Sequence, residues 1–333
     1  FFKQKTAYEI RNCDWSSDVC SSDLRILVRC SLVFLHDGPT SPELSSMFPI
    51  LRIRILILMT AGMGGWAWML VEPGLRSIEG TSGLSLFDAR IGTATAILWV
   101  VAAGVPAIVM GMFTSASGHP LSGLFAIGCA LLALAIKGGS MEGFLRSHPL
   151  PGAYRNLMVE TLLWQFGVLC LAWFGVGSFA PKLKPVVQQK WATDDHLGAD
   201  TRFTKPNATA WLAGLLAAGT AGFLAHLLLR SSDTGQVLGG LIVAFALGSL
   251  AAQWIFPQPN PLPILLSPLV LALLGYSYAL LKFPTHDSFL EAWYAQNLTG
   301  LALALPVHYA AAGLVGTTDR KSTRLNSSHS SVS

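Results

Sequence analysis

Long apolar runs, separated by short polar connections, make up most of the chain from residue 55 to residue 315. The runs show no strict alternation of apolar and polar positions, so they do not indicate the strands of a transmembrane barrel. A helix of about 20 residues is long enough to cross the hydrocarbon core of a bilayer. We therefore expect membrane-spanning helices at residues 55–71, 91–113, 121–136, 157–179, 210–229, 237–256, 262–281 and 298–315.

The third and the eighth runs depart from the pattern of the others. Residues 121–136 are only marginally long enough to span a membrane, and Pro306 interrupts the run at residues 298–315. The number of spans is therefore seven or eight. In either case the predicted fold class is all-α, a polytopic transmembrane helix bundle.

The composition agrees with a membrane protein and excludes several other classes. Hydrophobic residues make up 52% of the chain and charged residues 12%, whereas about a quarter of a soluble domain is charged. The formal net charge of +4 indicates no nucleic-acid partner, so the lipid bilayer is the expected partner, and protein partners stay open. The chain has no CxxC, HExxH or phosphate-loop motif, and we expect neither a metal nor another cofactor.

Both ends of the chain read as a translated sequencing adapter. The oligonucleotide GACTGGAGTTCAGACGTGTGCTCTTCCGATC encodes residues 14–23, and its reverse complement encodes residues 319–328. One oligonucleotide on both strands at both ends of a reading frame is typical of adapter carry-over. We therefore expect residues 1–24 and 319–333 to be foreign to the natural protein.

The part between these ends divides into two groups of helices. Residues 47–179 hold the first four predicted helices, and residues 210–318 hold the other three or four. A hydrophilic loop at residues 180–209 separates the two groups. Residues 25–46 precede the first methionine and form a doubtful upstream segment, and we expect the natural C-terminus to be missing from this chain.

Basic and acidic residues give an expected orientation. Arg52 and Arg54 precede the first helix, which usually dominates the positive-inside count. Although the two sides carry equal numbers of basic residues, we expect a multi-pass protein of the cell membrane with its N-terminus inside. The connections after the first, third, fifth and seventh helices are acidic, so an aqueous site is expected on that side. Their acidic residues are Glu72, Glu79, Asp88, Glu142, Asp233, Asp287 and Glu291.

Small residues recur at every fourth position in two neighbouring helices and predict close packing between them. The short connection between these helices makes them antiparallel neighbours, and small side chains let two backbones approach closely in lipid. His226 continues the first stripe, so we expect its side chain to point inward. The two stripes expected to face each other are Gly214, Ala218 and Gly222 on one helix, and Gly240, Ala244, Gly248 and Ala252 on the next.

Polar residues in or near the spans are the candidates for an intramembrane site. Such side chains are costly in a membrane, so each either bonds to another group or has a function. We expect Glu160 to pair with Lys137 or Arg155, or to act as a functional carboxylate. Asn297 and His308 are three helical turns apart and are expected to share a face. The candidate set is Glu160, His226, Lys137, Gln165, Asn297 and His308.

The sequence indicates an integral membrane protein but no specific activity. A permease for small molecules or ions needs polar groups that meet at mid-depth, and a membrane-embedded enzyme needs them clustered at one interface. An assembly or sensory scaffold needs neither. The candidates lie nearer one interface than the midplane, which slightly disfavours a permease. Few side chains are reactive, so no catalytic residue is assigned and an enzyme is disfavoured as well.

Overall fold

The computed structural model describes residues 41–76, 83–117, 120–183, 185, 205–257 and 260–318. The chain divides into two units, residues 1–50 and residues 51–333. Of the first unit only residues 41–50 are described, and they are helical; the bundle belongs to the second unit. The expected adapter segments, most of the doubtful upstream segment and most of the 180–209 loop lie outside the described residues.

The described residues form helices and no strand, and an isolated bridge joins Gly83 to Gly139. The long helices are α2 (Ser41–Leu75), α3 (Thr93–Ser117), α4 (Pro120–Lys137), α6 (Ala153–Cys170), α8 (Ala208–Leu228), α9 (Thr234–Ile255) and α11 (Ser267–Lys282). The shorter elements are α5 (Met141–Ser147), the π-helix η2 (Leu171–Phe179), α10 (Leu262–Leu265), α12 (His286–Tyr294), the 3-10 helix η4 (Gly300–Leu303) and α13 (Pro306–Thr318).

The all-α, polytopic helix bundle predicted from the apolar runs is confirmed. Six helices are long and apolar enough to cross a membrane, and the marginal third run forms a shorter apolar helix at Leu121–Lys137. The six are Leu51–Leu75, Thr93–Ser117, Ala153–Leu183, Ala208–Leu228, Thr234–Ile255 and Leu262–Lys282. The chain is therefore an integral membrane protein.

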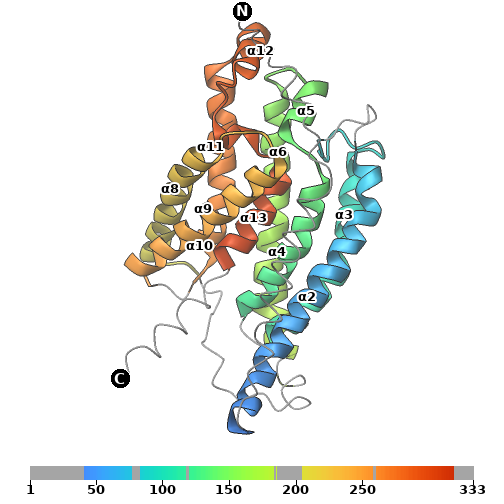
Figure 1. Cartoon of the computed structure of the whole chain (residues 1–333), viewed down its shortest axis with the longest axis vertical. Helices are drawn as coiled ribbons and strands as arrows, with labels where there is room; N and C mark the ends of the chain where they lie inside the picture. Colours follow the sequence, from blue (N-terminus) through green and yellow to red (C-terminus); the bar gives the residue numbers. More distant parts are fainter. Residues whose placement is uncertain are drawn as a thin grey trace, which may run out of the picture. The chain divides into compact units, whose positions relative to one another are not determined.

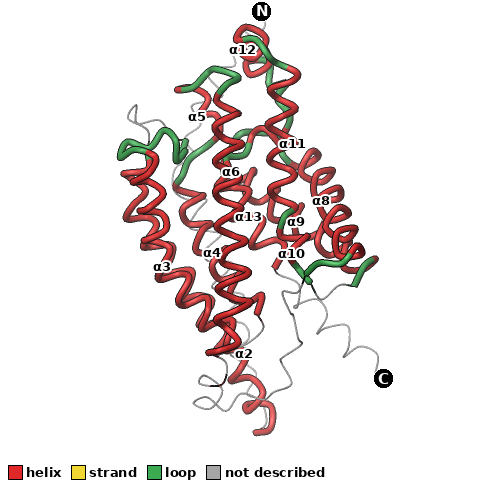
Figure 2. The backbone as a smooth tube through the Cα atoms, turned by 180° about the vertical axis from the view of Figure 1, so that it is seen from behind, coloured by secondary structure: helices red, strands yellow, loops and turns green. Residues whose placement is uncertain are grey.

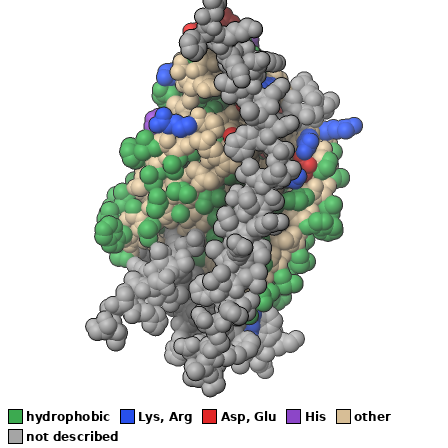
Figure 3. Space-filling model, in the orientation of Figure 1, with side chains coloured by type: hydrophobic (Ala, Val, Ile, Leu, Met, Phe, Trp, Pro, Cys, Tyr) green, Lys and Arg blue, Asp and Glu red, His purple; other side chains and the backbone are tan. Residues whose placement is uncertain are grey.

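Large apolar side chains cover the outward faces of these helices. Trp254 is 87% exposed, Leu281 83% and Leu58 70%. Figure 3 shows hydrophobic side chains along both flanks of the visible face, with most of the visible charged side chains above them. A soluble protein does not expose apolar area on this scale, whereas a membrane-spanning helix presents such a face to lipid.

The eighth apolar run does not form one continuous helix. Residues 297–305 run through a turn and η4, and α13 begins at Pro306. The described part of α13 is about 20 Å long, shorter than a hydrocarbon core of about 30 Å, and it does not face lipid. It lies instead in the middle of the bundle, as Figures 1 and 2 both show, and each of its residues is buried.

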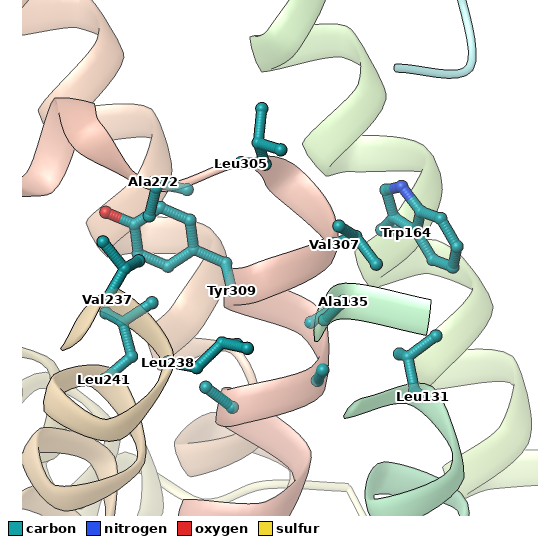
Figure 4. Close-up of a cluster of buried hydrophobic side chains, with 14 of the residues drawn as sticks. Leu131, Ala135, Trp164, Val237, Leu238, Leu241, Ala272, Leu305, Val307 and Tyr309 are labelled. Carbon is teal, nitrogen blue, oxygen red and sulfur yellow. The ribbon is translucent and has the colours of Figure 1, made fainter. Parts of the chain in front are cut away.

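Helix α13 is enclosed by helices from both halves of the chain. It packs against α4 and α6 from the first half and against α9, α10 and α11 from the second. In Figure 4 the ring of Tyr309 lies among side chains of α9 and α11, such as Val237 and Ala272, whereas Val307 lies on the side of Trp164. The C-terminal segment thus fills the space between the two helix groups.

Helices α8 and α9 are packed neighbours, as predicted, but the two stripes do not face each other throughout. A methyl group at Gly248 would contact Ala217 and Ala221 of α8, so this glycine lies in the α8–α9 interface. A methyl group at Gly214 would meet Pro263 of α10, and one at Gly222 would meet Leu271 of α11. The expectation that Gly214 and Gly222 face α9 is therefore wrong.

The predicted inward position of His226 is also wrong, because its side chain is exposed while Ala225 beside it is buried. Each step of four residues advances around an α-helix by about 40° beyond a full turn. Three such steps from Gly214 to His226 add about 120°, which carries the position away from the buried face. The buried face of α8 instead follows mixed steps of three and four residues, through Ala210, Ala213, Gly214, Ala217, Ala218, Ala221 and Ala225.

Candidate functional site

The candidate functional site is a buried carboxyl group, Glu160 of α6, held by the connection between α2 and α3. Ser85 Oγ donates to Glu160 Oε2 over 2.7 Å, and the backbone N–H of Leu86 donates to the same oxygen over 3.1 Å. Trp164, one turn further along α6, donates through Nε1 to Oε1 over 3.2 Å. The carboxyl group is fully buried and accepts all three hydrogen bonds from neutral donors.

The sequence-based pairing of Glu160 with Lys137 or Arg155 is wrong. Both basic side chains are exposed, and Glu160 takes part in none of the ion pairs Arg76–Glu72, Arg146–Glu142 and His148–Asp88 that the described residues form. Glu160 lies about 10 Å along its helix from Ala153, within the span Ala153–Leu183. It is therefore a membrane-embedded acid whose contacts are hydrogen bonds rather than a countercharge.

The connection that carries Ser85 and Leu86 is held in place by its own backbone contacts. Leu84 N donates to Gly138 O over 2.7 Å, and Arg90 N donates to Arg76 O over 2.9 Å. Gly83 packs so closely on Phe144 of α5 that no side chain fits there. Residues 83–92 are thereby fixed between α2, α4 and α5, with Ser85 and Leu86 directed at α6.

A second polar group lies beside the first. His148 Nε2 is 3.5 Å from Asp88 Oδ1, and the imidazole ring stacks on Phe144 with 5.1 Å between ring centroids. His148 Nδ1 lies 3.0 Å from Ser147 Oγ, whose hydroxyl donates to Phe144 O. Because the hydroxyl group of Ser147 uses its one proton to donate to Phe144 O, Nδ1 of His148 is the donor in the contact with Ser147 Oγ. This is the reverse of a base that activates a serine nucleophile.

The broken segment before α13 forms a third polar region, at the centre of the bundle. Three buried tyrosines from three helices donate to its carbonyl groups: Tyr154 to Ala302 O over 3.2 Å, Tyr276 to Ala304 O over 2.6 Å, and Tyr309 to Leu301 O over 2.6 Å. Non-helical backbone is tolerated at membrane depth only where its polar groups are satisfied in this way.

Two of the sequence candidates bond between helices, as expected. Gln165 Nε2 donates to Leu265 O over 2.6 Å and joins α6 to the end of α10. His308 Nδ1 accepts from Leu305 N over 3.3 Å, and its Nε2 lies 3.2 Å from Ala135 O of α4. Together these contacts specify a neutral imidazole protonated at Nε2, so His308 links α13 to α4.

Asn297 does not share a helical face with His308, and that expectation is wrong. Asn297 is exposed in a turn, whereas His308 is fully buried in α13. The spacing rule of three turns fails because the chain between them is not α-helical. His226 and Lys137 are exposed as well, so Glu160, Gln165 and His308 are the three of the six candidates that are buried.

Sequence reasoning missed the donors around Glu160 and the three buried tyrosines. Ser85 is 75 residues away from Glu160 in the chain, and no local pattern relates the two. Tyr154, Tyr276 and Tyr309 are aromatic residues in apolar surroundings, so their hydroxyl groups gave no polar signal in the sequence.

A comparison with protein-family models, curated proteins and solved structures finds no match to this chain.

Proposed function

We propose that the protein is a permease for a small molecule or ion and that Glu160 is its proton-exchanging group. The observation that carries the proposal is a fully buried carboxyl group in a membrane span without a basic partner among the described residues. Acidic residues inside membranes are costly and are typical of proton relays and of substrate pathways.

The broken C-terminal segment supports the same proposal. Discontinuous helices near the middle of a bundle are typical of transporters, where unwound backbone lies beside the transported species. In this chain η4 and α13 occupy that position, and α11, which contributes Tyr276, connects them to the rest of the bundle. A scaffold protein has no need of a helix interrupted at its centre.

The same geometry favours a membrane-embedded enzyme less than it favours a permease. Ser147, His148 and Asp88 lie in contact, but the serine proton is directed to Phe144 O rather than to the imidazole. A nucleophilic serine needs the opposite direction of proton donation. We therefore assign Ser147, His148 and Asp88 no role in acyl transfer.

The proposal predicts that Glu160→Gln abolishes solute-driven proton movement. Purified protein is reconstituted in liposomes with a trapped pH-sensitive dye, and neutral amino acids, sugars and carboxylic acids are added outside in turn. We expect at least one class to move protons through the wild type, and we expect the variant to lose about 100-fold in rate or more, because a positioned proton-transfer group contributes on that scale.

The control for this experiment is Glu142→Gln, which makes the same chemical change in a part-exposed carboxylate paired with Arg146. It should leave the rate unchanged. Trp164→Phe removes one of the hydrogen bonds to Glu160 and keeps the carboxyl group. If the Phe variant loses as much activity as Glu160→Gln, or if none of the three solute classes moves protons, the proposal fails.

We further propose that the shorter helix α4 also crosses the membrane and that the N-terminus lies on the inner side of the cell membrane, so that Ser232, which follows five crossings, lies on the outer side. The basis is the pair Arg52 and Arg54 before the first span. In a variant without native cysteines, Ser232→Cys should react with a membrane-impermeant maleimide added to intact cells. Labelling only after the cells are opened would reverse the orientation.

A further inference from the structure

His308 ties the start of α13 to the end of α4 through both nitrogens of its ring. Its Nδ1 accepts from the backbone N–H of Leu305 over 3.3 Å, and its Nε2 lies 3.2 Å from Ala135 O. Because Nδ1 accepts, the ring proton is on Nε2, which donates to Ala135 O. The ring is fully buried, so it holds these two backbone groups at a fixed separation. Figure 4 shows Ala135 beside the first turns of α13.

The end of α4 is also bonded to two other segments. The last carbonyl groups of a helix have no donor within the helix and need partners from elsewhere. Ala135 O has His308, Gly138 O accepts from Leu84 N over 2.7 Å, and Gly139 O accepts from the hydroxyl group of Thr234 over 3.0 Å. The end of α4 is therefore a junction between α13, α9 and the connection from α2 to α3.

The connection that reaches this junction is the one that holds Glu160. Leu84 donates to the end of α4, and the two residues that follow it both donate to Glu160 Oε2. Consecutive Cα atoms are about 3.8 Å apart, so Leu84 cannot move with the end of α4 without moving Ser85 as well. Hydrogen bonds and short stretches of chain thus lead without a gap from Leu305, in the broken segment, to Glu160.

Apolar packing already joins α13 to α4 at another level, so His308 is not needed for contact alone. A methyl group at Gly128 of α4 would lie 2.8 Å from Cβ of Leu314, which shows how closely the two helices approach there. A buried polar side chain with both of its hydrogen bonds made adds a fixed direction rather than apolar area. Such a side chain is suited to position other groups.

We propose that His308 is a positioning residue for proton exchange at Glu160. It fixes the end of α4 relative to the broken segment, and the end of α4 fixes the connection that donates to Glu160. A solute that displaces the broken segment alters the hydrogen bonds to Glu160 through this junction, and a change at Glu160 alters the affinity for the solute in return. This inference rests on the proposed role of Glu160 and adds the link between that residue and the broken segment.

The test follows the hydrogen bonds to Glu160 and needs no transported solute. The full chain is reconstituted in lipid, and infrared difference spectra between neutral and acidic pH record the carbonyl band of protonated carboxyl groups. The part of the band that Glu160→Gln removes belongs to Glu160. Ser85→Ala removes one donor and calibrates the measurement, because a carbonyl group that loses a hydrogen bond absorbs at higher frequency.

His308→Asn should shift the Glu160 band to higher frequency, in the same direction as Ser85→Ala. Asparagine can still accept from Leu305 N, but its side chain is too short to reach Ala135 O. His308→Gln extends an amide N–H about as far as Nε2 of histidine and should restore the wild-type band. In the liposome assay His308→Asn should slow solute-driven proton movement about 2- to 30-fold, the equivalent of about 0.5–2 kcal/mol of coupling.

The control is Ser249→Ala, which removes a contact of α13 on another side, from Ser249 Oγ to Gly316 O over 3.4 Å. A general loosening of α13 would appear in this variant too, so it should keep the wild-type band. A wild-type band in His308→Asn, or an equal shift in Ser249→Ala, would overturn the role of His308 and leave Glu160 as the proton-exchanging group. The lack of any pH-dependent band removed by Glu160→Gln would overturn the proposed function, and this inference with it.

Discussion

Gly248→Leu is expected to unfold the protein at a much lower temperature than the wild type in detergent. A methyl carbon at Gly248 would already lie 2.7 Å from the backbone oxygen of Ala217 and 3.0 Å from Cβ of Ala221. The first distance is shorter than side-chain carbons adopt, so α8 and α9 must separate. Overpacking of this kind costs about 1–3 kcal/mol for small insertions, and leucine adds three further carbons.

The matched control is Gly239→Leu, the same substitution on the same helix. A methyl group at Gly239 would have no heavy atom within 4 Å, and the residue is exposed. This variant should unfold at or slightly above the wild-type temperature, because an apolar side chain suits a lipid-facing or detergent-facing position and glycine is a poor helix former. Equal midpoints for the two leucine variants would show that α8 and α9 do not pack through Gly248.

Tyr276→Phe is expected to destabilise the centre of the bundle. The change removes only a hydroxyl group, but that group donates to Ala304 O in the segment between η4 and α13. Both the tyrosine and Ala304 are fully buried, so the carbonyl is left without this donor in surroundings that supply no water. The expected loss in the free energy of unfolding is about 1–3 kcal/mol.

Tyr278→Phe is the control, since Tyr278 is two residues away on α11 and 45% exposed. Thermal unfolding of the two variants, measured in the same detergent, gives the contrast. Tyr309→Phe should resemble Tyr276→Phe, because its hydroxyl donates to Leu301 O of the same broken segment. If Tyr276→Phe is as stable as Tyr278→Phe, the tyrosine hydroxyls do not hold the broken helix.

Local patterns predicted the positions of the spans closely. The run at residues 91–113 corresponds to Thr93–Ser117, and the run at 237–256 to Thr234–Ile255. These predictions succeed because the bilayer demands apolar side chains over a known length, and a helix is the simplest way to satisfy its own backbone there. The requirement acts on each span separately, so it is visible in the chain without knowledge of its neighbours.

The spacing of small residues in α8 and α9 was less informative about which face of each helix is buried. Gly248 is in the α8–α9 interface as expected, but Gly214 and Gly222 face α10 and α11, and His226 faces outward. An all-round apolar helix with many small residues has several faces that allow close approach. Which face is used depends on how many helices surround it, and α8 has neighbours on more than one side.

The sequence by itself determined the class of this protein and most of its membrane spans. The environment of Glu160 and the path of the last apolar run were decided only in the tertiary structure. Ser85 and Leu86 reach the carboxyl group of Glu160 because residues 83–92 are fixed against three other elements, and Trp164 donates to it from the same helix. Likewise, α13 is buried because helices from both halves enclose it, and the tyrosine hydroxyls of α6, α11 and α13 replace the hydrogen bonds that a continuous helix would have made. Whether a segment spans the membrane depends on the lipid around it, which is the same for every helix. The hydrogen bonds of a buried polar group depend instead on a few atoms that are far away in the chain.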